Sequence, residues 1–103
     1  MNGDQIEQLL RNVKEFDGAF SVDNLPDEPR LLVCNLEPSH KSGSHWICIC
    51  VDETVGEYFD SLGRAPDRAL ECYMNSKCTN WTYSRRQLQS IMSGHYCVYF
   101  LST

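Results

Sequence analysis

The apolar residues follow helical spacing near the start of the chain and form strand-like runs further along it. Near the start, four apolar residues stand at positions i, i+3, i+4 and i+7, the spacing of one face of an α-helix: Ile6, Leu9, Leu10 and Val13. This spacing predicts an amphipathic helix over residues 4–13, with Gly18 ending that region. A second helix is expected over residues 67–74, because Pro66 stands where a helix begins well.

Four later segments have the composition of β-strands. Residues 30–36 contain the continuous apolar run Leu31-Leu32-Val33-Cys34, as expected of a strand buried on both faces. Residues 45–52 are strongly β-prone. After a turn over residues 53–56, residues 57–61 are expected to form the hairpin partner of that strand. A short fourth strand is predicted over residues 80–83.

The remaining segments are predicted to connect these elements. Residues 37–44 and 62–66 have loop composition, and residues 85–92 are predicted to be a linker. Residues 94–101 are apolar and fit either a strand or a buried helix. The pattern predicts one α+β domain over residues 1–103, with a small central mixed or antiparallel sheet flanked by helices.

The composition indicates a globular chain and argues against nucleic acid and membranes as partners. Apolar residues make up 42% of the 103 positions, which argues against disorder. The net charge of −5 argues against nucleic acid as a partner, since phosphate binding needs clustered Lys and Arg and the densest cluster is Arg85–Arg86. No apolar stretch is long enough to span a membrane, so no membrane association is expected.

Six cysteines are many for this length, but their spacing is irregular. The polar start Met1-Asn2-Gly3-Asp4 does not resemble a secretory signal, so we expect an intracellular protein with reduced thiols. Zinc could be imagined at His40, His45, Cys48 and Cys50. No CxxC pair is present, and both of these cysteines lie in a strand pattern, so buried thiols are the better interpretation and no metal or other cofactor is expected.

Two residues with acid–base chemistry are predicted to meet at one edge of the sheet. His45 opens one strand, and Asp60 lies at the end of its predicted hairpin partner. A histidine at a strand's mouth is expected to be half exposed, where it can titrate and meet a substrate. In this interpretation Asp60 orients His45 as a general base. The alternative is a capping aspartate beside an unrelated surface histidine.

A third segment, residues 87–97, gains meaning only from a family resemblance. Three motifs occur in order: His45-Trp46, then Tyr58-Phe59-Asp60-Ser61 followed by Gly63 and Pro66, then a Gln-Ser pair before Gly94-His95-Tyr96-Cys97. Together they resemble the adenovirus-type and SUMO-protease-like cysteine proteases, most closely those of Polinton/Maverick transposons and related viruses. The resemblance covers nearly the whole chain and implies a papain-like or adenain-like fold.

The resemblance also implies roles for individual residues. His45 matches the general base, and Trp46 matches the aromatic residue beside it, which is expected to contact substrate. Asp60 matches the acid that orients the histidine. Gln89 matches the glutamine of the oxyanion hole by its Gln-Ser context, and Gln87 is the alternative.

The chain departs from the family at the nucleophile. Where the family has its catalytic cysteine directly before a glycine, this chain has Ser93, and Cys97 matches a second, non-catalytic cysteine. Ser93 itself and Cys97 are the alternative nucleophiles, but a site built for a thiolate lacks the tuning to deprotonate serine, and Cys97 is expected to be a buried thiol. Either Ser93 replaces the nucleophile, or a few residues including the cysteine are missing there. Gln89 lies four residues before Ser93, closer than is usual in the family, whereas Gln87 lies six residues before it, which is close to the family spacing.

The expected function follows from this departure. The chain is expected to be a cysteine-endopeptidase-type domain, of the viral or transposon maturation kind, that is inactive as it stands. The alternative is a non-catalytic peptide- or protein-binding module derived from such a protease, and a small zinc protein is a weaker third hypothesis. The resemblance implies a peptide or protein substrate with small residues before the cut, and it suggests an activating peptide as a further partner. It also implies a location in the host cytoplasm, nucleus or virion, and a nucleophile helix that is shorter than in related proteases.

Overall fold

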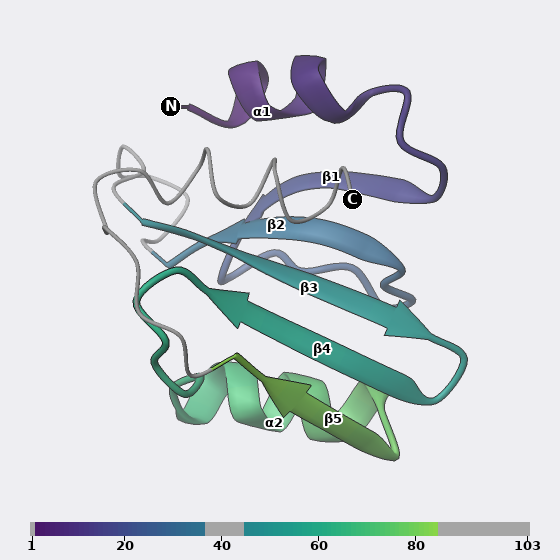
Figure 1. The fold of residues 1–103 in the computed structure, drawn as a ribbon, viewed down its shortest axis with the longest axis vertical. Coiled ribbons are helices and arrows are strands. Elements are labelled where there is room, and N and C mark those ends of the chain that lie inside the picture. Colours follow the sequence, from purple (N-terminus) through teal and green to yellow (C-terminus); the bar gives the residue numbers. More distant parts are fainter. Residues whose placement is uncertain (1, 37–44, 85–103) are drawn as a thin grey trace.

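Five strands form one mixed sheet in the order β1-β2-β3-β4-β5 (Figure 1). The computed structural model describes residues 2–36 and 45–84. In that part of the chain the elements, in chain order, are α1 (Gly3–Leu10), β1 (Phe16–Ser21), β2 (Leu31–Asn35), β3 (Trp46–Asp52), β4 (Val55–Asp60), α2 (Arg68–Lys77) and β5 (Asn80–Tyr83).

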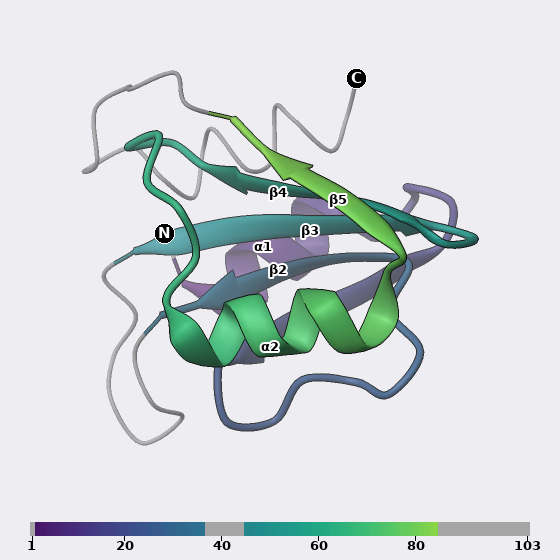
Figure 2. The same ribbon diagram turned by 90° about the horizontal axis from the view of Figure 1, so that it is seen from below.

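The three central strands are antiparallel, and each outer strand is parallel to its neighbour. β2, β3 and β4 form a meander, with Cys34 opposite Ile47 and Ile47 opposite Asp60. β1 runs parallel to β2, and β5 runs parallel to β4. Figure 2 shows that α1 and α2 lie on opposite faces of this sheet. The expected α+β class with a mixed sheet flanked by helices is therefore confirmed at this level of detail.

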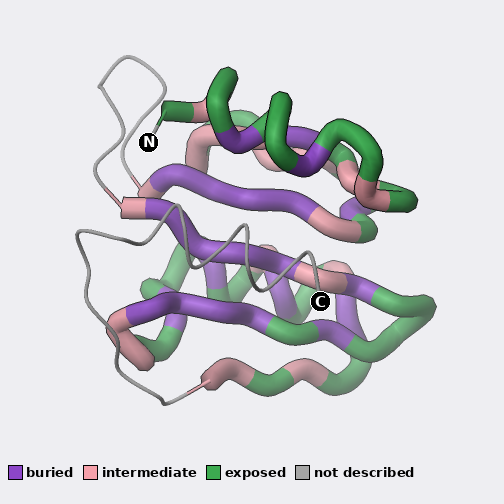
Figure 3. Tube along the Cα trace, turned by 45° about the horizontal axis from the view of Figure 1, so that its top comes forward, coloured by how far each residue is buried: buried purple, intermediate pink, exposed green. Residues whose placement is uncertain are grey.

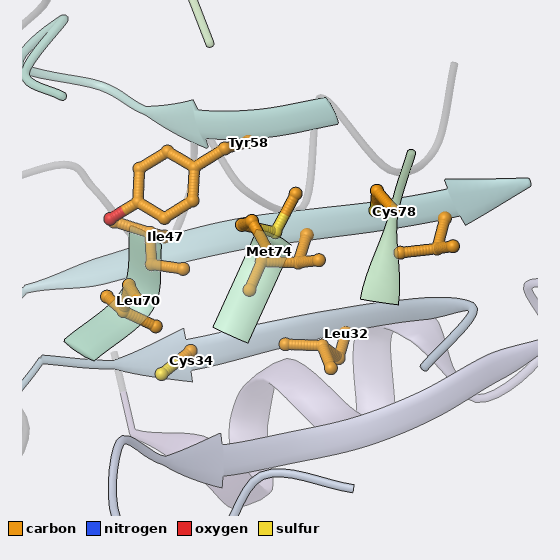
Figure 4. Close-up of a cluster of buried hydrophobic side chains, with 9 residues drawn as sticks. Leu32, Cys34, Ile47, Tyr58, Leu70, Met74 and Cys78 are labelled. Carbon is orange, nitrogen blue, oxygen red and sulfur yellow. The ribbon is translucent and has the colours of Figure 1, made fainter. Parts of the chain in front are cut away.

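Strand alternation divides the buried side chains into two clusters. We call the cluster under α2 the α2-side core: Leu32, Cys34, Ile47, Ile49, Val51, Tyr58, Leu70, Met74 and Cys78 (Figure 4). We call the cluster under α1 the α1-side core: Ile6, Leu10, Val33, Trp46, Cys48 and Phe59. Because successive residues of a strand point to opposite faces, β2 contributes to both cores. Figure 3 shows the buried stretches running along the central strands. Leu32 and Cys34 lie in the α2-side core and Val33 lies in the α1-side core, which confirms the prediction that β2 is buried on both faces.

Side-chain caps explain where the two helices begin. Asn2 accepts a hydrogen bond from the Gln5 N–H, and the Gln5 side chain accepts one from the Asn2 N–H, which completes a capping box at α1. Asp67 caps α2 by accepting from the Leu70 N–H. The predicted helix over residues 4–13 ends earlier than expected, at Leu10, and α2 runs beyond the predicted end, to Lys77.

The sequence pattern missed β1. Gly18 was expected only to end the helical region, but it lies inside the strand with φ 137°, a backbone conformation open to glycine. Two backbone N–H groups of this edge strand donate to side chains: that of Ala19 to Glu7 Oε2, and that of Ser21 to Asn24 Oδ1. These acceptors add to the parallel pairing of β1 with β2, and no apolar alternation marks the strand in the sequence.

The hairpin between β3 and β4 is tighter than the predicted turn over residues 53–56. β4 already begins at Val55, and Glu53 takes a left-handed conformation with φ 55° to close the connection. The strand over residues 80–83 is found as predicted. The predictions for residues 37–44, 85–92 and 94–101 lie outside the described residues. Within the described part of the chain, neither helix has the length and apolar character that crossing a bilayer requires.

Candidate active site

A tight turn after β4 presents the carboxylate of Asp60. The Gly63 N–H donates to the Asp60 carbonyl at 2.8 Å, and the Leu62 N–H donates to Asp60 Oδ1 at 2.8 Å. An aspartate at the first position of a turn makes this side-chain bond readily, and Gly63 supplies the left-handed φ of 69° that the turn needs. The local sequence therefore fixes the carboxylate before any other element contacts it.

His45 reaches this carboxylate from the neighbouring strand. It directly precedes β3, and its carbonyl accepts a hydrogen bond from the Leu36 N–H at 3.1 Å, which extends the pairing of β2 with β3. His45 Nε2 lies 2.7 Å from Asp60 Oδ1. The sequence predicted that these two residues meet at one edge of the sheet, and the structure brings them into hydrogen-bond contact.

The pair is more buried than the sequence suggested. The His45 side chain is 12% exposed and that of Asp60 is 2% exposed, so the expected half-exposed histidine is wrong. Its backbone pairs with Leu36 just after β2, and its ring lies against Asp60 at the end of β4. Burial strengthens the hydrogen bond, because the surrounding dielectric is lower than that of water.

The electrostatics of Asp60 set the protonation of the pair. Burial would raise the pKa of the Asp60 carboxyl, but hydrogen bonds from His45 and the Leu62 N–H, and the electrostatic attraction of His45 and Arg64, together hold that pKa below its ordinary value of 3.8. Asp60 is therefore an ionised acceptor near neutral pH. An acceptor facing Nε2 requires a proton on Nε2, so in the neutral ring the basic lone pair is on Nδ1.

Trp46 lies on the opposite face of the sheet from this pair. The residue is 6% exposed, and it belongs to the α1-side core. A Cβ added at Gly3 would lie 3.5 Å from the ring, so the indole packs against the first turn of α1. The ring thus anchors the start of β3, and its predicted contact with substrate stays a prediction.

Two features of the site were missed by sequence reasoning. Arg64 Nε lies 3.3 Å from Asp60 Oδ2. Ser61 is fully buried, and its hydroxyl has no hydrogen-bond partner among the residues that the structure describes. The spacing of Asp60 and Gly63 is a turn signal, from which the hydrogen bond of the Leu62 N–H to Asp60 could have been predicted. Nothing in the pattern singled out Arg64, because its contact depends on how the turn folds back.

The other predicted site residues, Gln87, Gln89, Ser93 and Cys97, lie outside the described residues. Of the suggested zinc ligands that are described, Cys48 is buried in the α1-side core and Cys50 is half-buried. Among residues 2–36 and 45–84, no three His, Cys, Asp or Glu side chains gather as a metal site would require.

Comparison with models of known protein families and with curated protein sequences finds no match. The interpretation of this site therefore rests on its residues and their geometry.

Proposed function

We propose that this chain is an adenovirus-protease-like domain in which His45 and Asp60 are the base and the orienting acid of a peptide hydrolase. We further propose that Ser93 directly replaces the nucleophilic cysteine, so that the chain binds peptides in the cleft of a protease without cleaving them at a protease's rate. The observation that carries the proposal is the 2.7 Å contact between His45 Nε2 and Asp60 Oδ1 at the mouth of two paired strands.

The pair has the features that a general base needs. Asp60 is fixed by its own turn, and it holds Nε2 of the imidazole so that the lone pair on Nδ1 has one direction. With a cysteine at position 93, Nδ1 would take the thiol proton and the thiolate would attack the substrate carbonyl. The imidazolium would then return the proton to the leaving amine, and water would release the acyl group in the second half of the reaction.

Serine at position 93 changes the energetics of the first step. A cysteine thiol has an ordinary pKa of about 8.5, and a neighbouring imidazolium lowers it further, so the thiolate forms easily. A serine hydroxyl is far less acidic and is deprotonated only in concert with its attack. A site arranged for a thiolate and an imidazolium therefore leaves Ser93 a poor nucleophile.

The test is to restore the thiol and measure turnover. Ser93→Cys is expected to cleave a fluorogenic peptide with Gly-Gly before the cut, whereas the unaltered chain binds the same peptide, by fluorescence anisotropy, without cleaving it. Adding His45→Ala to Ser93→Cys should lower kcat by roughly 10²–10⁴-fold, the usual contribution of a general base. Adding Cys97→Ala should leave turnover unchanged, which excludes Cys97 as the nucleophile.

Two outcomes would overturn the proposal. One is that Ser93→Cys shows no turnover although the peptide binds, and the other is that turnover survives His45→Ala.

The Ser93→Cys variant also decides between the two candidate glutamines of the oxyanion hole. Changing the glutamine that donates to the oxyanion to alanine should lower kcat by roughly 10²–10³-fold. The family spacing favours Gln87, and the Gln-Ser context favours Gln89.

A further inference from the structure

The two carboxylate oxygens of Asp60 have different partners. Oδ1 accepts from His45 Nε2 at 2.7 Å and from the Leu62 N–H at 2.8 Å. Oδ2 faces Arg64 Nε at 3.3 Å. A carboxylate held through one oxygen can still rotate about its Cβ–Cγ bond, whereas one held through both oxygens has a fixed plane. The Arg64 contact therefore bears on the direction in which Oδ1 points at the imidazole.

The turn after β4 makes this contact possible. The hydrogen bond from the Gly63 N–H to the Asp60 carbonyl closes the turn, and the left-handed conformation of Gly63 redirects the chain just before Arg64. Arg64 is then carried back beside the carboxylate, four residues after Asp60 in sequence. In the motif that carries the family resemblance, position 64 is one of the variable positions, so the resemblance assigns it no role.

The charges around Asp60 give Arg64 a distinct effect. Among residues 2–36 and 45–84, the titratable groups that face the carboxylate are His45 from the start of β3, Arg64 from the turn and Tyr58 from β4. Asp67, at the start of α2, acts on Tyr58. Burial, and next the charge of Asp60, raise the pKa of the Tyr58 hydroxyl, so Tyr58 stays neutral. Among the described residues facing Asp60, Arg64 is thus the partner with a permanent positive charge.

We propose that Arg64 is a positioning residue of the site, which fixes the plane of the Asp60 carboxylate so that His45 is held in the geometry of a base. The effect of Arg64 on Asp60 is inferred from the contact between Arg64 Nε and Asp60 Oδ2 alone. Its consequence for catalysis rests on the proposed function. Because the Arg64 side chain is 55% exposed, its contribution is a modest adjustment and not a requirement for folding.

The first test needs no activity. The Asp60 carboxyl carbon is titrated by NMR in the unaltered chain and in Arg64→Gln, Arg64→Lys and Arg68→Gln. Arg68 is the matched control, because it is an exposed arginine at the start of α2 that makes none of the hydrogen bonds to Asp60. Arg64→Gln should move the titration midpoint to higher pH, Arg64→Lys should restore part of that shift, and Arg68→Gln should move it less than Arg64→Gln. Equal midpoints in Arg64→Gln and Arg68→Gln would overturn the proposal.

The second test reads the consequence for catalysis in the Ser93→Cys background. Arg64→Gln should lower kcat by about two- to fivefold, in line with an exposed charge pair, and leave KM unchanged. The loss should be greatest at the acidic end of the pH profile, where Asp60 begins to take up a proton. A merely structural role would leave the shape of that profile unchanged, and that result would contradict the inference. If Ser93→Cys shows no turnover at all, the proposed function fails, and the titration alone decides the role of Arg64.

Discussion

Replacing Asp60 with asparagine removes a buried charge and leaves nearly the same shape. In the folded protein this carboxylate is 2% exposed and accepts hydrogen bonds from His45, the Leu62 N–H and Arg64. Asparagine can still accept from the Leu62 N–H through its amide oxygen. The amide is neutral, so it offers a charged acceptor to neither His45 nor Arg64, and the substitution weakens those two contacts.

The magnitude follows from the two contacts. A hydrogen bond to a charged group contributes about 1.5–3 kcal/mol, and this applies to the 2.7 Å contact with His45. The contact with Arg64 adds about 0–1 kcal/mol, because that side chain is 55% exposed and water screens its charge. Removing the desolvation cost of the carboxylate offsets part of this loss. We therefore expect Asp60→Asn to lower the free energy of unfolding by about 1–3 kcal/mol near neutral pH.

The effect depends on pH in a direction that the structure fixes. The pKa of Asp60 is lower in the folded protein than its ordinary value of 3.8, so its ionised form stabilises the fold. This stabilisation is fully present above the ordinary pKa and is lost as the pH falls through the lower, folded-state pKa. The difference between the unaltered protein and Asp60→Asn should therefore shrink as the pH is lowered below about 4.

Urea denaturation across this pH range measures the difference. Asp52→Asn is the matched control, because Asp52 is exposed at the far end of β3 and the same change there removes an exposed charge. An Asp60→Asn variant as stable as Asp52→Asn at neutral pH would refute the reasoning. A difference that stays constant down to the acid limit of the titration would do so as well.

Three smaller changes, measured by urea denaturation, test a buried hydroxyl, a close contact in the α2-side core and the cap of α2. Ser61→Ala removes a buried hydroxyl that has no partner in the described part of the chain, so stability should stay equal or rise by up to about 1 kcal/mol, and a clear loss would contradict this. Gly56→Ala should cost about 1–3 kcal/mol, because a Cβ there would meet Cys78 Sγ and lie 3.0 Å from Met74 Cε; a neutral result would show that these side chains can move aside. Asp67→Ala removes the cap of α2 and should cost about 1 kcal/mol, which Asp67→Asn should largely restore if capping is the cause.

The sequence predicted the strands that have a clear apolar or β-prone composition, including the partly exposed β5. The continuous apolar run of β2 and the β-prone β3 are buried on the sheet, and both were predicted within two residues of their ends. β1 escaped prediction because its order depends on acceptors elsewhere in the chain. Glu7 occupies the N–H of Ala19 from α1, and Asp17 accepts from the Arg30 N–H at 2.7 Å. Contacts of this kind between distant residues leave no periodic signal in the sequence.

The candidate site was predictable in its pairing and not in its environment. A hairpin places the start of β3 beside the end of β4, so the meeting of His45 and Asp60 follows from topology once both strands are recognised. The pairing of His45 with Leu36 extends beyond the predicted strands, and the Arg64 contact depends on the path of the chain after Gly63. Both are properties of the folded backbone and not of residue types.

The most direct test of the central claim is the reactivity of a thiol introduced by Ser93→Cys. Its alkylation by iodoacetamide at about pH 6 can be followed by mass spectrometry, with the exposed Cys72 as the internal reference in the same molecule. If His45 and Asp60 form a base that acts on position 93, the introduced thiol should react roughly 10- to 100-fold faster than Cys72, and His45→Ala should abolish the difference. An introduced thiol that reacts no faster than Cys72, or one whose rate is unchanged by His45→Ala, would contradict the assignment of the pair.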